Sequence, residues 1–533
     1  MFWVNYREKY RSHELTLQRL SQDKLNIMVI TGTSATTPST LEEVLALPNE
    51  EMKIYYLMHG RRFPNPDPLA LLRDWDPRRH KIMDPNEYKK IRVLKKPAWV
   101  EYDDNTKTSV QHSNEYEEKE PNRIALPIEQ DQVNIHTAFT VGTEPTLDCT
   151  PADDSESALL GCVKRVFNTN KLKYQNRQIV RSWLSETEVA EYWYIVPDDG
   201  FWPKLKKKYP DVFGNVPPMY KLKCQVWSPF RGDTLYPFYD DGGNLVAFSR
   251  RYKTVDLSGA EHECFMTVTD TMVYQWDLSK TWQPNSVRTF KHGFTKLPVI
   301  YAHRPNTLCE KIRPIRERLE KCLSGYADCI DFHFFPILML FGDLDNVKNT
   351  DMRNRIMQMT GTDAKAEYLT WDQASDPVKV EIDTYFNQAY ALTNTPRISF
   401  DQIKGTTALS GVAFRYVFMG IHAAVENHAE ELGPFFQRRV NFIISALGSI
   451  NTTLWQPSKT LEINTEIVPY IIDSVDDKVT TAAKAVEGGV WSTEHGVAFC
   501  SDYGETKDEV EQIMEEKQKT AQPTDDNGQQ TGK

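Results

Sequence analysis

The sequence lacks the short motifs that mark the common catalytic sites. It has no G-x-x-x-x-G-K-[ST] loop, no G-x-G-x-x-G after an expected strand, and no H-E-x-x-H in a helical segment. These absences leave a phosphate-loop NTPase, a dinucleotide-dependent enzyme and a zincin protease without support. We therefore expect no catalytic residues, no cofactor and no metal.

Cysteine pairs at metal-binding spacing are also missing. The eight cysteines form no C-x-x-C pair and no regular set of short spacings. This scatter favours reduced, mostly buried thiols from an intracellular assembly environment over a disulfide framework. Cys322 and Cys329 lie one heptad apart on an expected helix, where packing is sufficient explanation for both.

Long apolar runs are absent as well. The longest, Phe334–Phe341, has eight residues and contains Pro336, whereas a membrane helix needs about twenty. Met1–Arg11 carries four charged residues and no long apolar run, unlike a secretory signal. We expect a soluble chain with no membrane partner.

Three polar clusters resemble metal sites, and each has a simpler explanation. Glu261–Cys264 lies in an expected strand, where alternate side chains face opposite sides. His422 and His428 are six residues apart instead of the four that suit one ion, so we expect one surface and one packed histidine. The aspartates near the start of an expected helix suit its positive dipole end; they are Asp473, Asp476 and Asp477.

The formal charge of −11 bears on nucleic-acid binding. Proteins that hold DNA tightly place cations on its phosphates and release condensed counterions. An acidic chain is poorly suited to that task, but it can contact DNA that must keep moving.

The first half of the chain shows a helical region followed by a change of period. Residues 1–95 are expected to be helical, with a capping box at Ser39–Glu43. An acidic insertion at 101–121 predicts a solvated loop or hairpin, and 133–139 predicts an extended or short helical piece. Helical spacing returns at 158–167 and 178–188.

From Ala190 the apolar period is two, which predicts an antiparallel β domain. Asp240–Asn244 contains two glycines and is typical of a hairpin turn between two of its strands. The expected strands are 192–196, 222–227, 234–239, 245–252, 264–268 and 272–276.

Three helices dominate the second half. Apolar spacing of three and four residues predicts helices near 308–334 and 377–393, then one long helix that ends near 447 and is kinked at Pro434. On the first helix the charged residues are expected to form a solvated face. An apolar stripe as long as that of the last helix needs a neighbour to cover it, and we expect another copy of the chain. Beyond it we expect a strand at 461–468, a helix at 474–487, a Gly488-Gly489 break and a disordered tail.

The order of these parts resembles the portal proteins of tailed bacteriophages over about residues 40–515. The resemblance depends on His292-Gly-Phe-Thr-Lys-Leu-Pro-Val-Ile-Tyr before the first long helix and on Ser410-Gly-Val-Ala at the start of the last. It depends also on the strand, helix, glycine break and Ser492-Thr493 near the end.

The resemblance implies an α+β portal-type fold with a mixed wing, a helical stem, a small clip, a tunnel loop and a helical crown. The implied division is an N-terminal arm at 1–40, a wing at 41–305, a first stem helix at 306–335, a clip at 336–372, a second stem helix at 373–396, a tunnel loop at 397–410, a long helix at 411–458, a crown at 459–515 and a disordered tail at 516–533.

The resemblance also implies a function. The chain would form a ring of about twelve copies at one capsid vertex of the virion, assembled in the host cytoplasm, through which double-stranded DNA is packaged and ejected. Implied partners are the terminase large subunit, a head-tail adaptor, and the major capsid and scaffolding proteins.

Three groups of residues receive implied roles. DNA-facing residues of the tunnel loop are Arg397, Lys404, Gly405, Thr406 and Thr407. Clip residues that contact DNA, the motor or the adaptor are Lys348, Arg353 and Arg355, for which a solvated face is an equal alternative. Helix packing between subunits is assigned to Ile315, Leu319, Tyr326, Phe418, Ile421 and Val425. Two other functions stay open: a cytosolic multidomain enzyme with a dispersed site, and another ring-forming virion adaptor.

Overall fold

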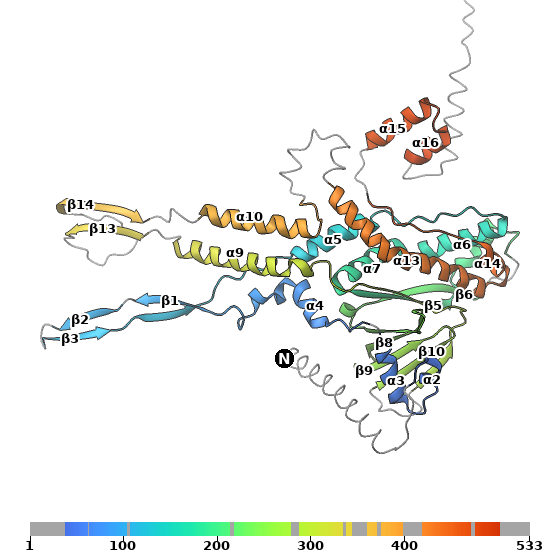
Figure 1. Ribbon diagram of the computed structural model, residues 1–533, viewed down its shortest axis with the longest axis horizontal. Coiled ribbons are helices and arrows are strands. Elements are labelled where there is room, and N and C mark those ends of the chain that lie inside the picture. The colour runs from blue at the N-terminus through green and yellow to red at the C-terminus, as the bar shows by residue number, and fades with distance from the viewer. Residues whose placement is uncertain are drawn as a thin grey trace, which may run out of the picture. The chain divides into compact units, whose positions relative to one another are not determined.

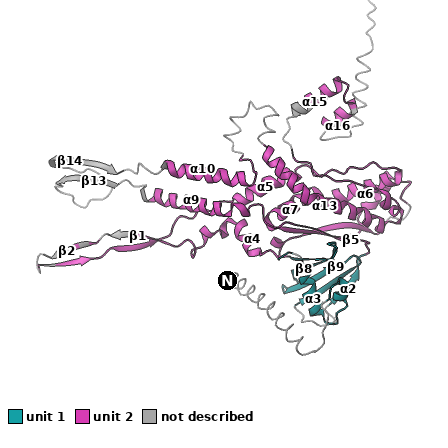
Figure 2. Ribbon diagram, in the orientation of Figure 1, with its two compact units in different colours: residues 1–64, 234–292 teal, residues 65–233, 293–533 magenta. Residues whose placement is uncertain are grey.

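The computed structural model describes residues 38–500 apart from 62, 97, 104–106, 214–217, 279–286, 334–336, 344–359, 370–374, 398–417 and 471–474. Two compact units divide the chain, one made of residues 1–64 and 234–292 and the other of 65–233 and 293–533 (Figure 2). Both combine helices with antiparallel sheets, so the α+β class is confirmed.

The first unit is built on a five-stranded antiparallel sheet in the order β11-β10-β9-β8-β7. A hairpin turn at Asp240–Asn244 joins β7 to β8, and Gly243 adopts a φ of +85° there, as the sequence predicts. Helix α3 packs against β7, and α2 packs against α3. The bounds are α2 Leu41–Leu45, α3 Glu50–His59, β7 Thr234–Tyr239, β8 Leu245–Val255, β9 Glu261–Val268, β10 Met272–Asp277 and β11 Val287–Lys291.

The second unit contains a three-stranded antiparallel sheet in the order β12-β5-β6. Helices α7 and α13 pack against this sheet, and α5 packs against α7 (Figure 1). Four tryptophans that are almost fully buried belong to this unit: Trp183, Trp193, Trp202 and Trp227. The bounds are α5 Ile128–Val141, α6 Asp154–Asn170, α7 Leu172–Glu186, β5 Glu188–Pro197, α8 Phe201–Lys208, β6 Tyr220–Trp227 and β12 Val299–His303.

Helix α13, Met419–Ile450, is the longest described helix and contains Pro434. Its apolar stripe, which includes Val425, Leu432 and Phe435, packs into a core shared with α5, α6, β6 and β12 of the same chain. Arg439 on the same helix is buried, and its Nε lies 2.7 Å from a carboxylate oxygen of Glu191. The expectation that only another copy could cover this stripe was therefore wrong.

Helices α9, Arg313–His333, and α10, Ser375–Leu392, lie side by side (Figure 1). Between them in sequence is a two-stranded ribbon of β13, Ile337–Asp343, and β14, Thr360–Leu369. The predicted hairpin at 101–121 is present as part of two further two-stranded ribbons, β1–β4 and β2–β3. Their bounds are β1 Ile91–Lys96, β2 Trp99–Asp103, β3 Thr108–His112 and β4 Glu115–Lys119.

Short helices complete the described chain, and α15 packs against α16. They are α4 Pro68–Trp75, η1 Pro77–Arg79, η2 Lys81–Met83, η3 Pro229–Arg231, η6 Glu310–Ile312, η7 Thr452–Leu454, α14 Pro457–Thr460, α15 Val475–Glu487 and α16 Thr493–Cys500.

Of the two alternatives for residues 133–139 the helical one is confirmed, because they lie inside α5. Two sequence predictions need correction. The single β domain is two sheets in two units, because β5, β6 and β12 pair separately from β7–β11. Residues 461–468 form only a bridge, in which Asn464 pairs with Asp148. Periodicity identifies a strand but does not identify its partner.

Candidate functional site

A segment of the chain, residues 122–126, is hydrogen-bonded to one face of α9; we call it the strap. The amide of Asn122 donates to Asp328 Oδ1 at 2.8 Å, that of Ile124 to Ser324 Oγ at 3.0 Å, and that of Leu126 to Glu320 Oε1 at 2.9 Å. Acceptors four residues apart lie on one face of a helix, so an extended segment can follow them. The strap therefore holds α9 along about two turns.

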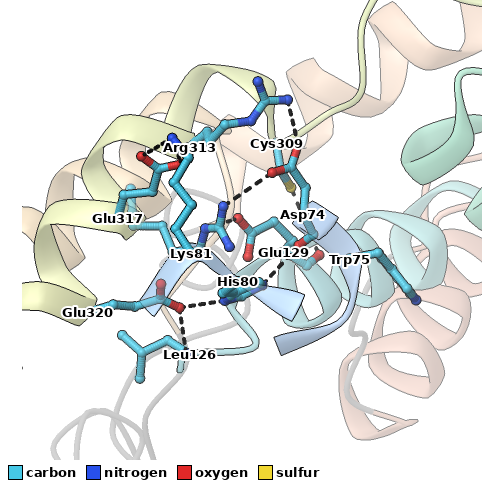
Figure 3. A network of polar contacts seen from close by, with 12 residues as sticks. Asp74, Trp75, His80, Lys81, Leu126, Glu129, Cys309, Arg313, Glu317 and Glu320 are labelled. Carbon is cyan, nitrogen blue, oxygen red and sulfur yellow. Dashed lines mark hydrogen bonds and ion pairs between the residues drawn. The ribbon is translucent and has the colours of Figure 1, made fainter. Parts of the chain in front are cut away.

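A network of charged groups, buried except for the partly exposed Asp74, fixes the base of α9 (Figure 3). We call it the charged anchor, and it comprises Asp74, His80, Glu129, Arg316 and Glu320. The Nε of Arg316 lies 2.7 Å from Glu129 Oε1, and its Nη2 lies 3.3 Å from Asp74 Oδ1. His80 contacts Glu320 Oε1 at 2.6 Å through Nδ1 and the carbonyl oxygen of Asp74 at 3.1 Å through Nε2. Both ring nitrogens face acceptors, which the doubly protonated imidazolium satisfies.

Two partly exposed ion pairs surround the charged anchor. Arg313 Nη2 lies 2.5 Å from Asp74 Oδ2, and Lys81 Nζ lies 3.0 Å from Glu317 (Figure 3). Burial raises the pKa of Glu129 to about 7, although the Arg316 guanidinium acts in the opposite direction. The charged anchor thus joins α4, η2 and α5 to α9 through charges removed from water.

A second buried network, without net charge, lies where α10 ends; we call it the neutral anchor, and it comprises His136, Thr393, Thr395 and His428. Nδ1 of His136 lies 3.0 Å from Nε2 of His428, and Nε2 of His136 lies 3.0 Å from Thr395 Oγ1. The Thr393 and Thr395 hydroxyls are 2.8 Å apart. Of two facing ring nitrogens one must donate and the other accept, which neutral rings can do and two imidazolium ions cannot.

Burial keeps both histidines of the neutral anchor uncharged. It lowers the pKa of His136 to about 4 and that of His428 to about 3, and the guanidinium of Arg304 acts in the same direction on both. His428 also meets the face of Trp183 edge-on at a centroid distance of 5.5 Å. The two rings therefore behave as core residues that carry hydrogen bonds.

Contacts at and beside the neutral anchor hold the chain on both sides of segment 398–417. Thr395 precedes the segment by three residues, and Phe418, which follows it directly, packs against Phe139 at a centroid distance of 5.5 Å. His136 and Phe139 both belong to α5. The two chain ends that flank this segment are thus held on one helix of the folded body.

Most of the sequence matches a known family. A family model described as "Phage portal protein, SPP1 Gp6-like" matches residues 51–523. The chain belongs to this family of phage portal proteins.

Three solved structures also match this portal protein. They are titled "Virion of native gene transfer agent (GTA) particle", "Neck of empty GTA particle computed with C6 symmetry" and "Neck of native GTA particle computed with C12 symmetry". Identities are 11%, 12% and 11%, and TM-scores 0.35, 0.36 and 0.35; each match covers 70% of this chain and 89%, 90% and 90% of the other. No curated protein matches the sequence.

Most of the tunnel-loop and clip residues assigned from the sequence lie outside the described residues. These are Lys404, Gly405, Thr406, Thr407, Lys348, Arg353 and Arg355. Arg397 is described: it is exposed, its Nη1 donates to Asn387 Oδ1 at 2.9 Å, and its guanidinium lies 5.4 Å from the ring centre of Phe386. The side chain lies against the end of α10.

Four of the six residues assigned to packing between subunits are instead buried inside one chain of the portal protein: Leu319, Phe418, Ile421 and Val425. The same-chain core supplies their contacts, so they are not available to a neighbour. Ile315 and Tyr326 are half-buried. The helix pair exposes three other apolar side chains, namely Ile330 at 43%, Val380 at 65% and Leu392 at 51%.

The anchors are buried polar networks that sequence reasoning missed. Arg316 and Glu320 belong to the charged face of α9, which we expected to be solvated, yet each is 1% exposed. His428 was expected to be packed, which is confirmed, but its partner His136 is distant in sequence. The available signal was a polar residue at a core position of the helical repeat.

Two kinds of feature are absent from the described residues of the portal protein. In that part of the chain no group of three or more His, Cys, Asp or Glu side chains is arranged to hold a metal ion. Within the same residues no helix has the length and apolar character to cross a bilayer.

Proposed function

We propose that this portal protein assembles into a closed ring of about twelve copies at one capsid vertex, around a channel for double-stranded DNA. The observation that carries the proposal is the family match over residues 51–523, which spans both units and both anchors. In this proposal α9 and α10 form the stem, and their anchors transmit force between the stem and the folded body.

The net charge of the chain favours a channel through which DNA moves over a site that binds DNA tightly. Its net charge of −11 disfavours the dense phosphate contacts that would bind DNA at every step of its movement. In the proposed channel the tunnel loop, 397–410, meets the duplex, with Lys404 and Arg397 making brief phosphate contacts and Thr406 and Thr407 offering neutral hydroxyls. Gly405 allows a tight turn.

The exposed apolar residues of the helix pair support contact with a neighbouring copy. Ile330, Val380 and Leu392 lie on the two proposed stem helices, beside the half-buried Ile315 and Tyr326. A head-to-tail contact that closes on itself covers such residues in every copy. We assign subunit packing to these five residues in place of the four that the chain already buries.

The remaining partners follow from the same proposal. The clip, with Lys348, Arg353 and Arg355, docks the terminase large subunit during packaging and the head-tail adaptor afterwards. Energy for DNA movement comes from the separate terminase, and the capsid and scaffolding proteins surround the ring in the virion. The portal protein itself contributes a passage and a docking surface.

Imaging and weighing the purified full chain test the ring. We expect annular particles by negative-stain electron microscopy and a light-scattering mass near twelve times the 61.6 kDa of the chain. Substituting Val380→Asp and Leu392→Asp together should weaken assembly, whereas Val255→Asp and Val490→Asp, on exposed residues outside the stem, serve as the matched control. A compact monomer at high concentration, with no annular species in assembled particles, would refute the proposal.

Deletion of Lys404–Thr407 tests the tunnel loop separately. Ring assembly should be unchanged, because both chain ends that flank the loop are anchored outside the deletion. The amount of DNA packaged per particle should fall. Normal packaging by intact rings of this variant would remove the role given to these residues.

A further inference from the structure

Positive charge is concentrated in one part of this acidic chain. Residues 164–223 contain twelve lysines and arginines against six aspartates and glutamates, whereas the whole chain carries −11. Three of these six acids, Glu186, Glu188 and Glu191, are buried. The surface formed by this part of the second unit is therefore more basic than its composition alone indicates.

A groove of about 550 Å³ lies within this basic surface. It is formed by β5, β6 and the turn between α6 and α7. Lys223 is paired across the strands with Tyr194, and Lys221 with Val196, so both lysines lie on one face of the sheet, on its edge strand β6. Lys171 contributes from the turn.

Two of the groove lysines are positioned by the fold. Lys171 is exposed and has a φ of +52°, a left-handed conformation that joins the two helices. Lys221 is buried and hydrogen-bonds Asp199, whose side chain is 77% exposed. That hydrogen bond is the main cause that keeps the pKa of Asp199 below its ordinary value. The Asp199 carboxylate thus competes with any other anion for Lys221.

Helices α7 and α8 extend the basic surface beyond the groove. The indole of Trp202 in α8 donates to the carbonyl oxygen of Tyr220 at 2.8 Å, which holds α8 beside the start of β6. The exposed cations on these helices are Lys173, Arg177, Arg181, Lys204, Lys207 and Lys208. On α7, Tyr174 is also 61% exposed.

We propose that this surface, centred on the groove of Lys171, Lys221 and Lys223, binds the phosphate backbone of double-stranded DNA at a site separate from the tunnel loop. The proposal deepens the proposed function, because it relies on DNA being the molecule that the ring handles. Lysines spread over several elements match a row of phosphates and carry no base specificity. An acidic peptide is the weaker candidate, since the groove is lined mainly by polar groups and offers little apolar anchorage.

Fluorescence anisotropy of a labelled duplex of about 20 base pairs tests the proposal with the full chain. Lys171→Asn with Lys223→Gln should weaken binding roughly ten-fold or more at low salt and lower the salt slope by about 2. Asparagine tolerates the left-handed conformation at position 171, so folding is retained. Asp199→Asn removes the competing carboxylate and should tighten binding.

Lys89→Gln with Lys119→Gln is the matched control, because it removes two exposed lysines outside the basic surface. Three outcomes would each overturn the proposal. They are an equal loss of duplex affinity in this control, an unchanged affinity in the groove variant, and no duplex binding by the wild-type chain. Stronger competition by polyglutamate than by unlabelled duplex at equal charge would also overturn it, in favour of an acidic peptide.

Negative-stain images of every variant separate this inference from the proposed ring. Rings that form normally while the groove variant loses DNA affinity support both proposals. A chain that never forms rings but loses DNA affinity in the groove variant contradicts the ring and supports the groove.

Discussion

The charged anchor and the neutral anchor hold neighbouring parts of the same body with opposite chemistry. At the base of α9, Arg316 is enclosed by the carboxylates of Asp74 and Glu129. At the end of α10, two uncharged imidazoles and a threonine hydroxyl share hydrogen bonds. Both sites are buried, so both have lost their contacts with water.

The difference predicts different responses to mutation and to pH. Removing one member of a buried ion pair leaves an uncompensated charge, whereas removing one member of a neutral pair leaves a polar atom without a partner. The uncompensated charge costs more free energy of folding than the unpaired polar atom. The charged anchor should therefore be fragile to substitution and the neutral anchor fragile to acid.

The largest effect is expected from Arg316→Met. The change leaves the buried Glu129 beside no guanidinium, whereas Asp74 keeps its ion pair with Arg313, and the loss of stability should be about 3–5 kcal/mol. Arg318→Met is the matched control on the same helix, because Arg318 pairs with Glu381 at 2.6 Å but is 51% exposed. Its cost should be below about 1 kcal/mol.

Differential scanning calorimetry of the two variants measures this comparison. Adding Glu129→Leu to Arg316→Met should recover part of the loss, because it removes the carboxylate that has lost its guanidinium. Similar shifts in melting temperature for Arg316→Met and Arg318→Met would show that burial does not set the strength of the charged anchor.

The next effect is a pH response of opposite sign at the two anchors. The pKa values of His136 and His428, about 4 and about 3, lie below the ordinary 6.5, so the unfolded chain binds protons that the folded chain does not. Their contribution to stability is complete above pH 6.5 and is lost as the pH falls through 4. Each unit by which the pKa is lowered corresponds to about 1.4 kcal/mol of folding free energy.

Glu129 responds in the other direction. Its pKa of about 7 lies above the ordinary 4.5, so its contribution is complete below pH 4.5 and is lost as the pH rises through 7. Melting temperatures between pH 4.5 and 7.5 should fall less steeply on acidification in His136→Gln with His428→Gln than in the wild type. They should fall more steeply in Glu129→Gln. Identical pH curves for all three proteins would contradict both assignments.

Much of the fold follows from the sequence because apolar spacing is a local property. The capping box at the start of α2 is confirmed, with Thr40 accepting from the amide of Glu43. The strands β7, β8 and β10, the hairpin turn at Asp240–Asn244 and the helices α9 and α10 were also predicted close to their observed positions. These elements depend on residues that are near one another in the chain.

The anchors could not be predicted for the same reason. His80 meets Glu320 across 240 positions, and His136 meets His428 across 292. Periodicity places Val425 on the apolar face of α13 but does not identify which surface covers it. The sequence alone suggested another copy of the chain, whereas α5 and the sheet of the same chain cover that face.

A smaller effect is expected from Thr395→Val. The change keeps the shape of the side chain and leaves Nε2 of His136 without the hydroxyl, which should cost about 1–3 kcal/mol. Thr384→Val is the control, because its hydroxyl bonds Val380 on the exposed part of α10. Hydrogen exchange should show faster opening of residues 389–395 only in the first variant. Equal exchange rates in the two variants would show that the neutral anchor does not hold the chain end that precedes the loop.

The smallest effect is expected from Lys81→Ala, at the edge of the charged anchor. Lys81 lies 3.0 Å from Glu317, but the two side chains are 50% and 27% exposed, so water and salt screen the pair. The cost should stay below about 1 kcal/mol at low salt and vanish near 1 M NaCl, while that of Arg316→Met should persist. A cost for Lys81→Ala as large as that for Arg316→Met, unchanged by salt, would show that the outer pairs and not the buried ones hold α9 in place.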